Sequence, residues 1–202
     1  MAENITGTGP RPIVRRFNQL IDALENVGAR YSICGATAMG AYGAQRFTHH
    51  IDLLVAQGDL EPVVAELAKT MRELGREPTT GDAKQVRLRS KRARTLAGVD
   101  IDLMVPVDPI EAWAISTCVR ARAFERKVDV VSAEALVLMK LQAYLSNPES
   151  ERGSQHRADA LALLRVAKIN LGDIRQFLKG SLQKLEAFEK LLRVPSSTGR
   201  LG

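Results

Sequence analysis

The sequence predicts an α+β protein, with a mixed α/β part up to about residue 131 and a mostly helical part after it. Short apolar runs bounded by turn residues are typical of strands, and all of them lie in the first part. Segments with apolar residues at helical spacing lie between these runs, and after about residue 131 only such helical segments follow. The 202 residues, 45% hydrophobic and 26% charged, have the composition of a globular protein.

The first half of the mixed part alternates helices and strands. Apolar residues recur at helical spacing after Pro12 and a glycine in "NVGAR" ends the segment, so we expect a helix over 12–27. "YSICG" is then a short strand ending in a glycine turn. Small residues predict a tightly packed short helix over 36–43, "HIDLLVA" is a buried strand, and apolar spacing predicts a helix over 60–74.

Alternating polarity predicts two further strands. "QVRLRS" alternates apolar and basic residues, and "GVDIDLMVP" alternates again before a proline. These two strands can pair as a hairpin across "KRARTLAG". A helix over 109–123 and a strand over 127–131 complete the mixed part.

The last third of the chain is predicted to be helical. Ser132 suits the N-cap of the helix in "SAEALVLMKLQAYL", and further helices are expected over 154–168 and 171–192. The predicted organisation is an α/β domain over 1–131, a helical part packed on it over 132–192, and a disordered tail over 193–202.

Charge and cysteine content narrow the functional classes. The 29 Lys and Arg against 23 Asp and Glu give a net charge of +6, which favours an anionic partner such as a nucleotide or RNA. Cys34 and Cys118 are too few and too far apart to indicate a disulfide scaffold or a zinc cluster. The first residues lack the apolar core of a signal peptide, and no apolar run is long enough to span a membrane. We therefore expect a cytoplasmic protein without membrane contact.

Three acidic residues lie inside predicted apolar strands, where an ionised carboxylate is costly unless it meets a cation or hydrogen-bond donors. Side chains two residues apart share a face of a strand, so His50 with Asp52 and Asp100 with Asp102 form two polar rows. On neighbouring strands these rows can converge on one or two divalent cations, and carboxylate oxygens suit Mg²⁺ or Mn²⁺. The alternative is structural, because acids near strand ends are often solvated or paired with Arg.

The stretch "ICGATAMGAYGAQRFTHHIDLLV" resembles the signature of the polymerase-beta-like nucleotidyltransferase superfamily. In that superfamily a strand ends in Gly-Gly or Gly-Ser, a short helix follows, and the next strand carries Asp-x-Asp or Asp-x-Glu. The stretch is most similar to the version in minimal nucleotidyltransferases related to the AbiEii toxins, where a Gly-Gly turn leads through Arg-x-Thr or Arg-x-Ser to Asp-Ile-Asp. The residues at the corresponding places are Gly35, Ala36, Arg46, Thr48, Ile51 and Asp52.

Three later segments continue the resemblance in the same order, over about 30–165. "GVDIDLMVP" resembles the strand of the third carboxylate, with Asp102 a better match than Asp100. "VDVVSAEALVLMKLQAY" resembles the strand and helix that carry a Lys, here Lys140, and "RGSQHRADALALL" is similar to the next helix, with Asp159 in its second acid position. The implied fold is a nucleotidyltransferase-type mixed β-sheet with flanking helices, followed by a helical C-terminal part.

The resemblance implies transfer of a nucleotidyl group from a nucleoside triphosphate to a hydroxyl. The turn over 35–37 would bring backbone N–H groups close to the phosphates, with further contacts from Arg46, Thr48 and Lys140. Carboxylates would hold Mg²⁺ or Mn²⁺ ions that activate the attacking hydroxyl and steady the pyrophosphate. The candidate metal ligands are Asp52, Asp102, Asp100 and His50. The acceptor is left open between a tRNA end or other RNA, a protein and a small molecule, and the toxin-like relatives imply a cognate partner protein.

Three residues depart from the family pattern. His50 stands at the first Asp, where an imidazole can ligate one metal but contributes no negative charge, so weaker Mg²⁺ binding and better tolerance of Mn²⁺ are expected. Ala36 replaces the second Gly or Ser of the turn, and the neighbouring Thr37 can supply a hydroxyl. His156 lies three residues before Asp159, where the family often has another acid.

A basic segment, "KQVRLRSKRAR", precedes the second acidic strand. It is either a solvated hairpin or a track for the phosphates of an RNA acceptor. Its basic residues are Lys84, Arg87, Arg89, Lys91, Arg92 and Arg94.

Three functional hypotheses follow. The first is a metal-dependent nucleotidyltransferase in which Asp52, Asp102 and His50 carry the chemistry. The second is a catalytically impaired protein of the same fold that acts as a nucleotide-binding regulatory or interaction module, for which the missing first carboxylate is the main support. A third and weaker hypothesis is a basic RNA-binding protein with structural acids.

Overall fold

The computed structural model describes residues 12–44, 46, 48, 50–73, 76–80, 85–90 and 100–193, and gives the backbone alone for Pro12 and for the described residues within 70–90. The predicted tail over 193–202 lies outside these residues, apart from Arg193. The elements in chain order are α1 (Pro12–Asn26), β1 (Tyr31–Cys34), α2 (Gly35–Ala41), β2 (His50–Val55), the 3₁₀ turn η1 (Gln57–Asp59), α3 (Leu60–Glu73), β3 (Arg76–Thr80), β4 (Gln85–Ser90), β5 (Asp100–Met104), α4 (Pro109–Ser116), β6 (Val119–Ala123), β7 (Arg126–Val130), α5 (Ala133–Ser146), α6 (Glu151–Val166), α7 (Leu171–Leu178) and α8 (Leu182–Leu192).

Seven strands of the described chain form one mixed sheet in the order β3-β4-β5-β2-β1-β7-β6. β2 is parallel to β5, and β1 is parallel to β7. The other neighbours are antiparallel. The predicted class, an α+β fold with a mixed sheet and flanking helices, is therefore confirmed.

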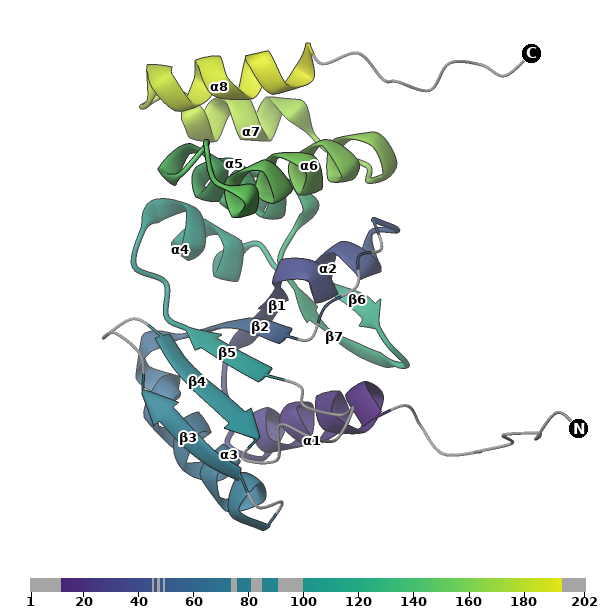
Figure 1. Ribbon diagram of the computed structural model, residues 1–202, viewed down its shortest axis with the longest axis vertical. Helices are drawn as coiled ribbons and strands as arrows, with labels where there is room; N and C mark the ends of the chain where they lie inside the picture. The colour runs from purple at the N-terminus through teal and green to yellow at the C-terminus, as the bar shows by residue number, and fades with distance from the viewer. Residues whose placement is uncertain are drawn as a thin grey trace, which may run out of the picture.

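Helices cover both faces of the sheet (Figure 1). α1 and α3 pack together on one face, while α2 and α4 lie on the other, next to the stack of α5 to α8. Along β2, Ile51 and Leu53 are fully buried on the face toward α1 and α3. Because side chains alternate along a strand, Asp52 must point to the opposite face, toward α2 and the helical stack.

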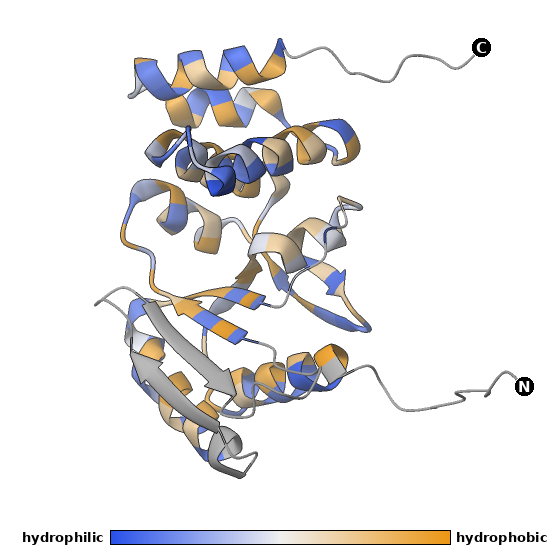
Figure 2. Cartoon of the chain, in the orientation of Figure 1, coloured by the Kyte–Doolittle hydropathy of each residue, from blue (hydrophilic) through white to orange (hydrophobic). Residues whose placement is uncertain are grey.

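The helical stack has an apolar interior, and the first turns of α6 are polar. Leu136, Val137 and Leu138 on α5 are fully buried. Hydrophilic residues gather at the beginning of α6, where the chain returns toward the sheet (Figure 2). None of the described helices combines the length and apolar character that crossing a membrane requires.

Most predicted elements are present within two or three residues of their expected bounds. The hairpin predicted from "QVRLRS" and "GVDIDLMVP" is the antiparallel pair of β4 and β5. Ser132 is the N-cap of α5, where its hydroxyl accepts a hydrogen bond from the N–H of Ala135. β3 was not predicted, because "REPTT" lacks apolar alternation; its proline is tolerated because β3 is an edge strand.

The predicted helix over 109–123 is wrong in its second half. α4 stops at Ser116, and residues 119–123 form β6. This segment pairs with β7 along its whole length, from Val119 opposite Val130 to Ala123 opposite Arg126. Pairing with β7 thus gives the backbone N–H and C=O groups of this segment hydrogen-bond partners, which the end of a helix would leave to solvent.

The single helix predicted over 171–192 is also wrong, because it is divided into α7 and α8. The chain turns at Gly180, and the N–H of Ser181 donates to the carbonyl of Leu178 at 2.9 Å. Glycine has a low helix propensity, so it favours such an interruption. The turn lets α8 fold back onto α7 and α5.

Asp108 fixes α4 against the helical stack. Its Oδ1 accepts hydrogen bonds from the N–H groups of Ile110 and Glu111 at 2.8 and 2.9 Å. Its Oδ2 accepts one from Nε2 of Gln142 on α5 at 2.6 Å. Gln142 in turn accepts from Lys184 on α8 at 2.7 Å, so one carboxylate helps to hold three helices in place.

We expect Asp108→Ala to lower the free energy of unfolding by about 2 kcal/mol, because it removes both an N-cap and a contact between helices. For a domain of this size, that corresponds to a fall in melting temperature of about 4–8 °C. The matched control is Asn170→Ala, which removes the side-chain cap of α7 alone. Calorimetry should show the larger loss for Asp108→Ala, and equal losses would contradict the role assigned to the Gln142 contact.

Candidate active site

Gly35 makes room for the Asp52 carboxylate at the end of β1. Its φ is +63°, in the left-handed region that disfavours side chains. A Cβ placed on Gly35 would lie 2.0 Å from Oδ2 of Asp52. Only glycine therefore fits here, and the reason is the acid on the neighbouring strand.

Asp52 and Asp102 occupy matching positions on β2 and β5. The parallel register pairs Asp52 with Asp102 and His50 with Asp100, so all four side chains lie on one face of the sheet. Asp102 is only 4% exposed. Burial, and then the charge of Asp102, raise the pKa of Asp52, while Lys140 is the largest opposing influence. The site thus holds two carboxylates that repel each other in a poorly solvated place.

His50 sits beside the acids of β5. Its Nδ1 lies 3.5 Å from Oδ2 of Asp102 and 3.9 Å from Oδ2 of Asp100, and its side chain is 42% exposed. The Thr48 hydroxyl accepts a hydrogen bond from the N–H of His50 and donates one to its carbonyl, both at 3.1 Å. Thr48 therefore fixes the backbone at the start of β2, and its hydroxyl already makes two hydrogen bonds to His50.

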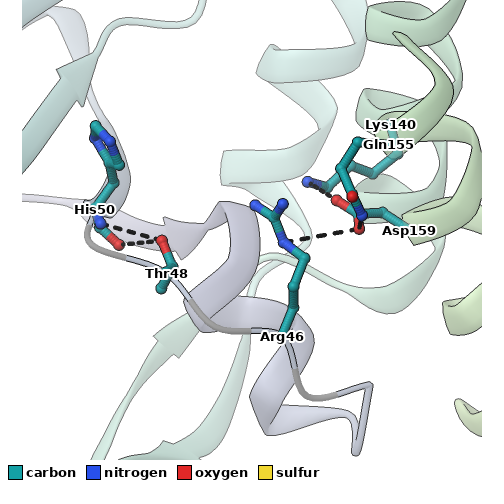
Figure 3. A network of polar contacts seen from close by, with 6 residues as sticks. All are labelled: Arg46, Thr48, His50, Lys140, Gln155 and Asp159. Carbon is teal, nitrogen blue, oxygen red and sulfur yellow. Dashed lines mark hydrogen bonds and ion pairs between the residues drawn. The ribbon is translucent and has the colours of Figure 1, made fainter. Parts of the chain in front are cut away.

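Basic side chains approach the acids from the helical part. Lys140 on α5 donates to Oδ2 of Asp159 on α6 at 2.7 Å, and both side chains are almost fully buried. Gln155 donates to the other oxygen of Asp159 at 2.8 Å. Nε of Arg46 lies 3.8 Å from that same oxygen. Arg46 thus reaches from the loop before β2 to α6, while His50 lies apart from this cluster (Figure 3).

A cavity of about 320 Å³ lies between the sheet and the helical part. Gly35, Asp52 and Lys140, which were assigned to one site from the sequence, all line this cavity. Its apolar wall comes from α4 and α5 and includes Ile110, Leu136 and Met139.

Two further residues of this cavity, Arg152 and His156, were not among the predicted site residues. Nδ1 of His156 is buried and has no hydrogen-bond partner within the described residues. Burial, followed by the charges of Lys140 and Arg152, lowers the pKa of His156 and so favours its neutral imidazole. No local pattern in the sequence singles out Arg152, because its importance arises only from the cavity that it lines.

The other predicted nucleotide-binding residues lie elsewhere. Ala36, Thr37, Arg46 and Thr48 line a second cavity of about 620 Å³, which also involves the turn between β6 and β7. The predicted nucleotide-binding residues are therefore divided between two cavities. The division falls at the beginning of α2, where Gly35 lines the first cavity and Ala36 the second.

Two predictions are not resolved by the described residues. In the basic segment, Lys84, Lys91, Arg92 and Arg94 lie outside them, and the side chains of Arg87 and Arg89 are not described. The predicted metal ligands Asp52, Asp102, Asp100 and His50 share a face, but no group of three or more His, Cys, Asp or Glu in the described chain is arranged to hold a metal ion.

We expect Asp52→Asn to raise the melting temperature at neutral pH. Folding raises the pKa of the Asp52 carboxyl, so the folded state favours its protonated form. The resulting stabilisation is complete at a pH below the pKa of the unfolded chain. It is lost as the pH rises through the pKa of the folded chain. The amide keeps the shape and removes the repelling charge. Thermal melts over a pH series should show the gain at neutral pH and its disappearance in acid. Asp173→Asn, on the exposed surface of α7, is the control, and a wild type at least as stable as Asp52→Asn at neutral pH would contradict the expectation.

The family model described as nucleotidyl transferase AbiEii toxin, Type IV TA system, matches residues 20–195 of the chain. No curated protein matches the chain.

Solved structures share the fold at low sequence identity. ANT(2'')-Ia in complex with adenylyl-2''-tobramycin has 13% identity and a TM-score of 0.61, over 89% of this chain and 99% of that one. An antigenic nucleotidyltransferase-like protein from Paracoccidioides brasiliensis has 15% identity and a TM-score of 0.55, over 88% and 91%. The lincomycin-bound lincosamide antibiotic adenylyltransferase LnuA has 11% identity and a TM-score of 0.50, over 76% and 97%.

These structures establish that the chain has a nucleotidyltransferase fold, and the family model extends over nearly all of its described elements. The resemblance found in the motifs of the sequence is thereby confirmed. The chain belongs to the AbiEii nucleotidyltransferase toxin family of type IV TA systems.

Proposed function

We propose that this chain transfers a nucleotidyl group from a nucleoside triphosphate to a hydroxyl acceptor. The observation that carries the proposal is the pair of carboxylates, Asp52 and Asp102, side by side on one face of the sheet, with Asp52 in the same cavity as Lys140 and Arg152. Acidic groups on one wall and basic groups on the other are what a metal-bound triphosphate requires. Membership of a nucleotidyltransferase family supports the same class of reaction.

The chain's own residues divide the work of binding the triphosphate. Lys140 and Arg152 line the cavity and would offset phosphate charge. Gly35 leaves room for the Asp52 carboxylate at the edge of this cavity. The apolar wall of Ile110, Leu136 and Met139 would accept the less polar nucleoside. Asp159 would keep the Lys140 ammonium in position, because it accepts a hydrogen bond from Nζ.

The donor set suits a divalent cation that arrives with the triphosphate. Mg²⁺ is commonly held by one or two carboxylates together with substrate phosphates, and Asp52 and Asp102 supply such a pair. Burial and the charge of Asp102 raise the pKa of Asp52, and a bound cation would favour its ionised form. His50 adds a nitrogen donor beside Asp102 and Asp100, which favours Mn²⁺ over Mg²⁺. A cation held there would polarise the reacting phosphate and make the acceptor hydroxyl more acidic.

The acceptor and the partner are proposed from the family. We propose an RNA acceptor because the net charge of +6 favours an anionic partner, and a cognate antitoxin protein because the family is one of TA-system toxins. ANT(2'')-Ia and LnuA are described with antibiotics, so the same fold also accommodates small-molecule hydroxyl acceptors in those proteins.

A second candidate function is favoured by His50. An imidazole in place of a carboxylate removes one negative charge from the site, which weakens cation binding. His156 likewise replaces an acid expected from the family pattern. The corresponding proposal is a module that binds a nucleoside triphosphate and a partner protein but does not transfer the nucleotide.

Transfer can be tested with radiolabelled nucleoside triphosphates, Mg²⁺ or Mn²⁺ and total cellular RNA. We expect label to enter RNA, more strongly with Mn²⁺, and to fall to background in Asp52→Ala, because one of the two central carboxylates is lost. The control is Asp173→Ala, which removes an exposed acid from α7 and should leave transfer unchanged. Absence of labelling with either metal would overturn the enzymatic proposal.

Replacement of the histidine separates the two candidate functions. If the site is intact apart from His50, His50→Asp should raise transfer with Mg²⁺ by about tenfold or more, because it restores an oxygen ligand with negative charge. His50→Asn adds an oxygen without the charge and serves as the control. If the wild type and His50→Asp both bind a fluorescent triphosphate analogue but neither transfers the nucleotide, the result would support the second candidate function.

A further inference from the structure

We propose that the second cavity, between α2 and the β6–β7 turn, binds the end of a single-stranded nucleic acid. The assignment of that strand as the acceptor rests on the proposed function, whereas its binding does not. The cavity has a volume of about 620 Å³, and none of its lining residues lies in the cavity of Asp52. The residues that carry the argument are Thr37, Arg46, Arg122 and Phe124.

Two guanidinium groups give this cavity the charge that phosphates require. Arg46 comes from the loop before β2 and Arg122 from β6, and both are solvent-exposed. Arg122 lies opposite Lys127 across the hairpin, so the neighbouring strand adds positive charge at this point. Within the described chain, no carboxylate pairs with Arg122. An unpaired Arg beside another on a cavity wall is well suited to bind a phosphodiester.

Phe124 presents an aromatic ring at the mouth of the cavity. It begins the two-residue turn between Ala123 and Arg126 and has a φ of +52°, a conformation usually occupied by glycine in such turns. The ring meets Phe17 edge to face, with centroids 5.0 Å apart, and the residue stays 37% exposed. A bulky residue in a left-handed conformation, held in one orientation and still exposed, provides a platform on which a base can stack.

Thr37 places an unpaired hydroxyl in the same cavity. The residue is 8% exposed, and Oγ1 is buried without a hydrogen-bond partner among the described residues. A buried polar atom in this state is costly unless a ligand satisfies it. A phosphate oxygen or a sugar hydroxyl is a suitable partner for it.

Two residue links connect the second cavity to the first. Gly35 lines the cavity of Asp52 while its neighbour Ala36 lines the second. Arg46 lines the second cavity and also lies beside Asp159, which holds Lys140 in the first (Figure 3). For the acceptor role, the end of the strand has to pass from Ala36 and Arg46 toward the cavity of Asp52.

A single strand fits these features better than a duplex. Bases in a duplex are stacked on one another and are not available to an isolated ring, whereas an unpaired base can stack on Phe124. Two guanidinium groups and one ring match a short segment with adjacent phosphates and one splayed base. The chemistry is shared by RNA and DNA, so both are included in the test.

The test measures binding of fluorescein-labelled single-stranded RNA and DNA oligonucleotides to the full chain by anisotropy, without triphosphate. We expect Phe124→Gly to weaken binding on the order of 5- to 150-fold, the value of one stacked base. Glycine suits the left-handed backbone at this position, so loss of folding is not the expected cause, and thermal melts check this. Phe124→Tyr keeps the ring and should retain binding.

Arg122→Ala should weaken binding and reduce the slope of log K against log salt concentration by about one, because one phosphate contact is lost. The charge-matched control is Arg165→Ala at the exposed end of α6, which should leave affinity within about twofold. Preference for RNA, preference for DNA or equal binding would each support the site, and would identify the natural strand. Equal binding of duplexes, equal affinity of the glycine and tyrosine variants, or equal weakening by both arginine substitutions would overturn it.

Assays of both binding and transfer in two of these variants separate this proposal from the proposed function. Asp52→Ala should abolish transfer but bind the oligonucleotide normally. Phe124→Gly should bind a fluorescent triphosphate analogue normally but lose transfer to RNA. If strand binding depends on Phe124 and Arg122 while no transfer occurs, the cavity stands and the enzymatic proposal falls. If transfer to RNA occurs and is unchanged in Phe124→Gly and Arg122→Ala, the cavity proposal falls alone.

Discussion

The repulsion between Asp52 and Asp102 is the constraint on which the rest of the site depends. The parallel register of β2 and β5 sets these acids side by side, and burial removes much of the water that would screen them. Gly35 has to be glycine because the Asp52 carboxylate occupies the space of its side chain. The sheet alone thus creates a destabilised carboxylate, and the raised pKa of Asp52 expresses that cost. Sites that bind cationic or metal-bound ligands commonly retain such a cost.

The helical part compensates this charge only partly. Lys140 is the largest influence that opposes the raised pKa of Asp52, but Nζ of Lys140 donates its short hydrogen bond to Asp159. Arg46 reaches toward the same carboxylate from the loop before β2. Asp159 therefore holds basic groups near the acids of the sheet without letting them form a closed ion pair with Asp52. The cavity thus keeps an acidic and a basic side, as the proposed binding of a metal-bound triphosphate requires, and Arg46 also lines the second cavity.

Much of the fold could be predicted from the sequence, because many of its elements have clear local signals. Apolar spacing identified α1 and α3, and alternation identified the β4–β5 pair. The errors lie where tertiary contacts overrule weak local preferences. Residues 119–123 form a strand because β7 pairs with them, and the helix predicted over 171–192 turns at Gly180, which lets α8 pack against α7 and α5. For the site, alternation correctly placed His50 with Asp52, and Asp100 with Asp102, on one face. Arg152, Phe124 and Arg122 carry no comparable signal, because their importance arises only from the surfaces that they line.

The sequence by itself determined the class of fold, the family and the acids that share a strand face, because side-chain alternation and motif order are local properties of the chain. Only the tertiary structure decided that Asp102 rather than Asp100 lies opposite Asp52, and that Lys140 is bound to Asp159. It also decided that Gly35 and Ala36 line different cavities, although they are neighbours in the chain. Strand register and helix packing depend on contacts between residues far apart in sequence, so no local pattern records them.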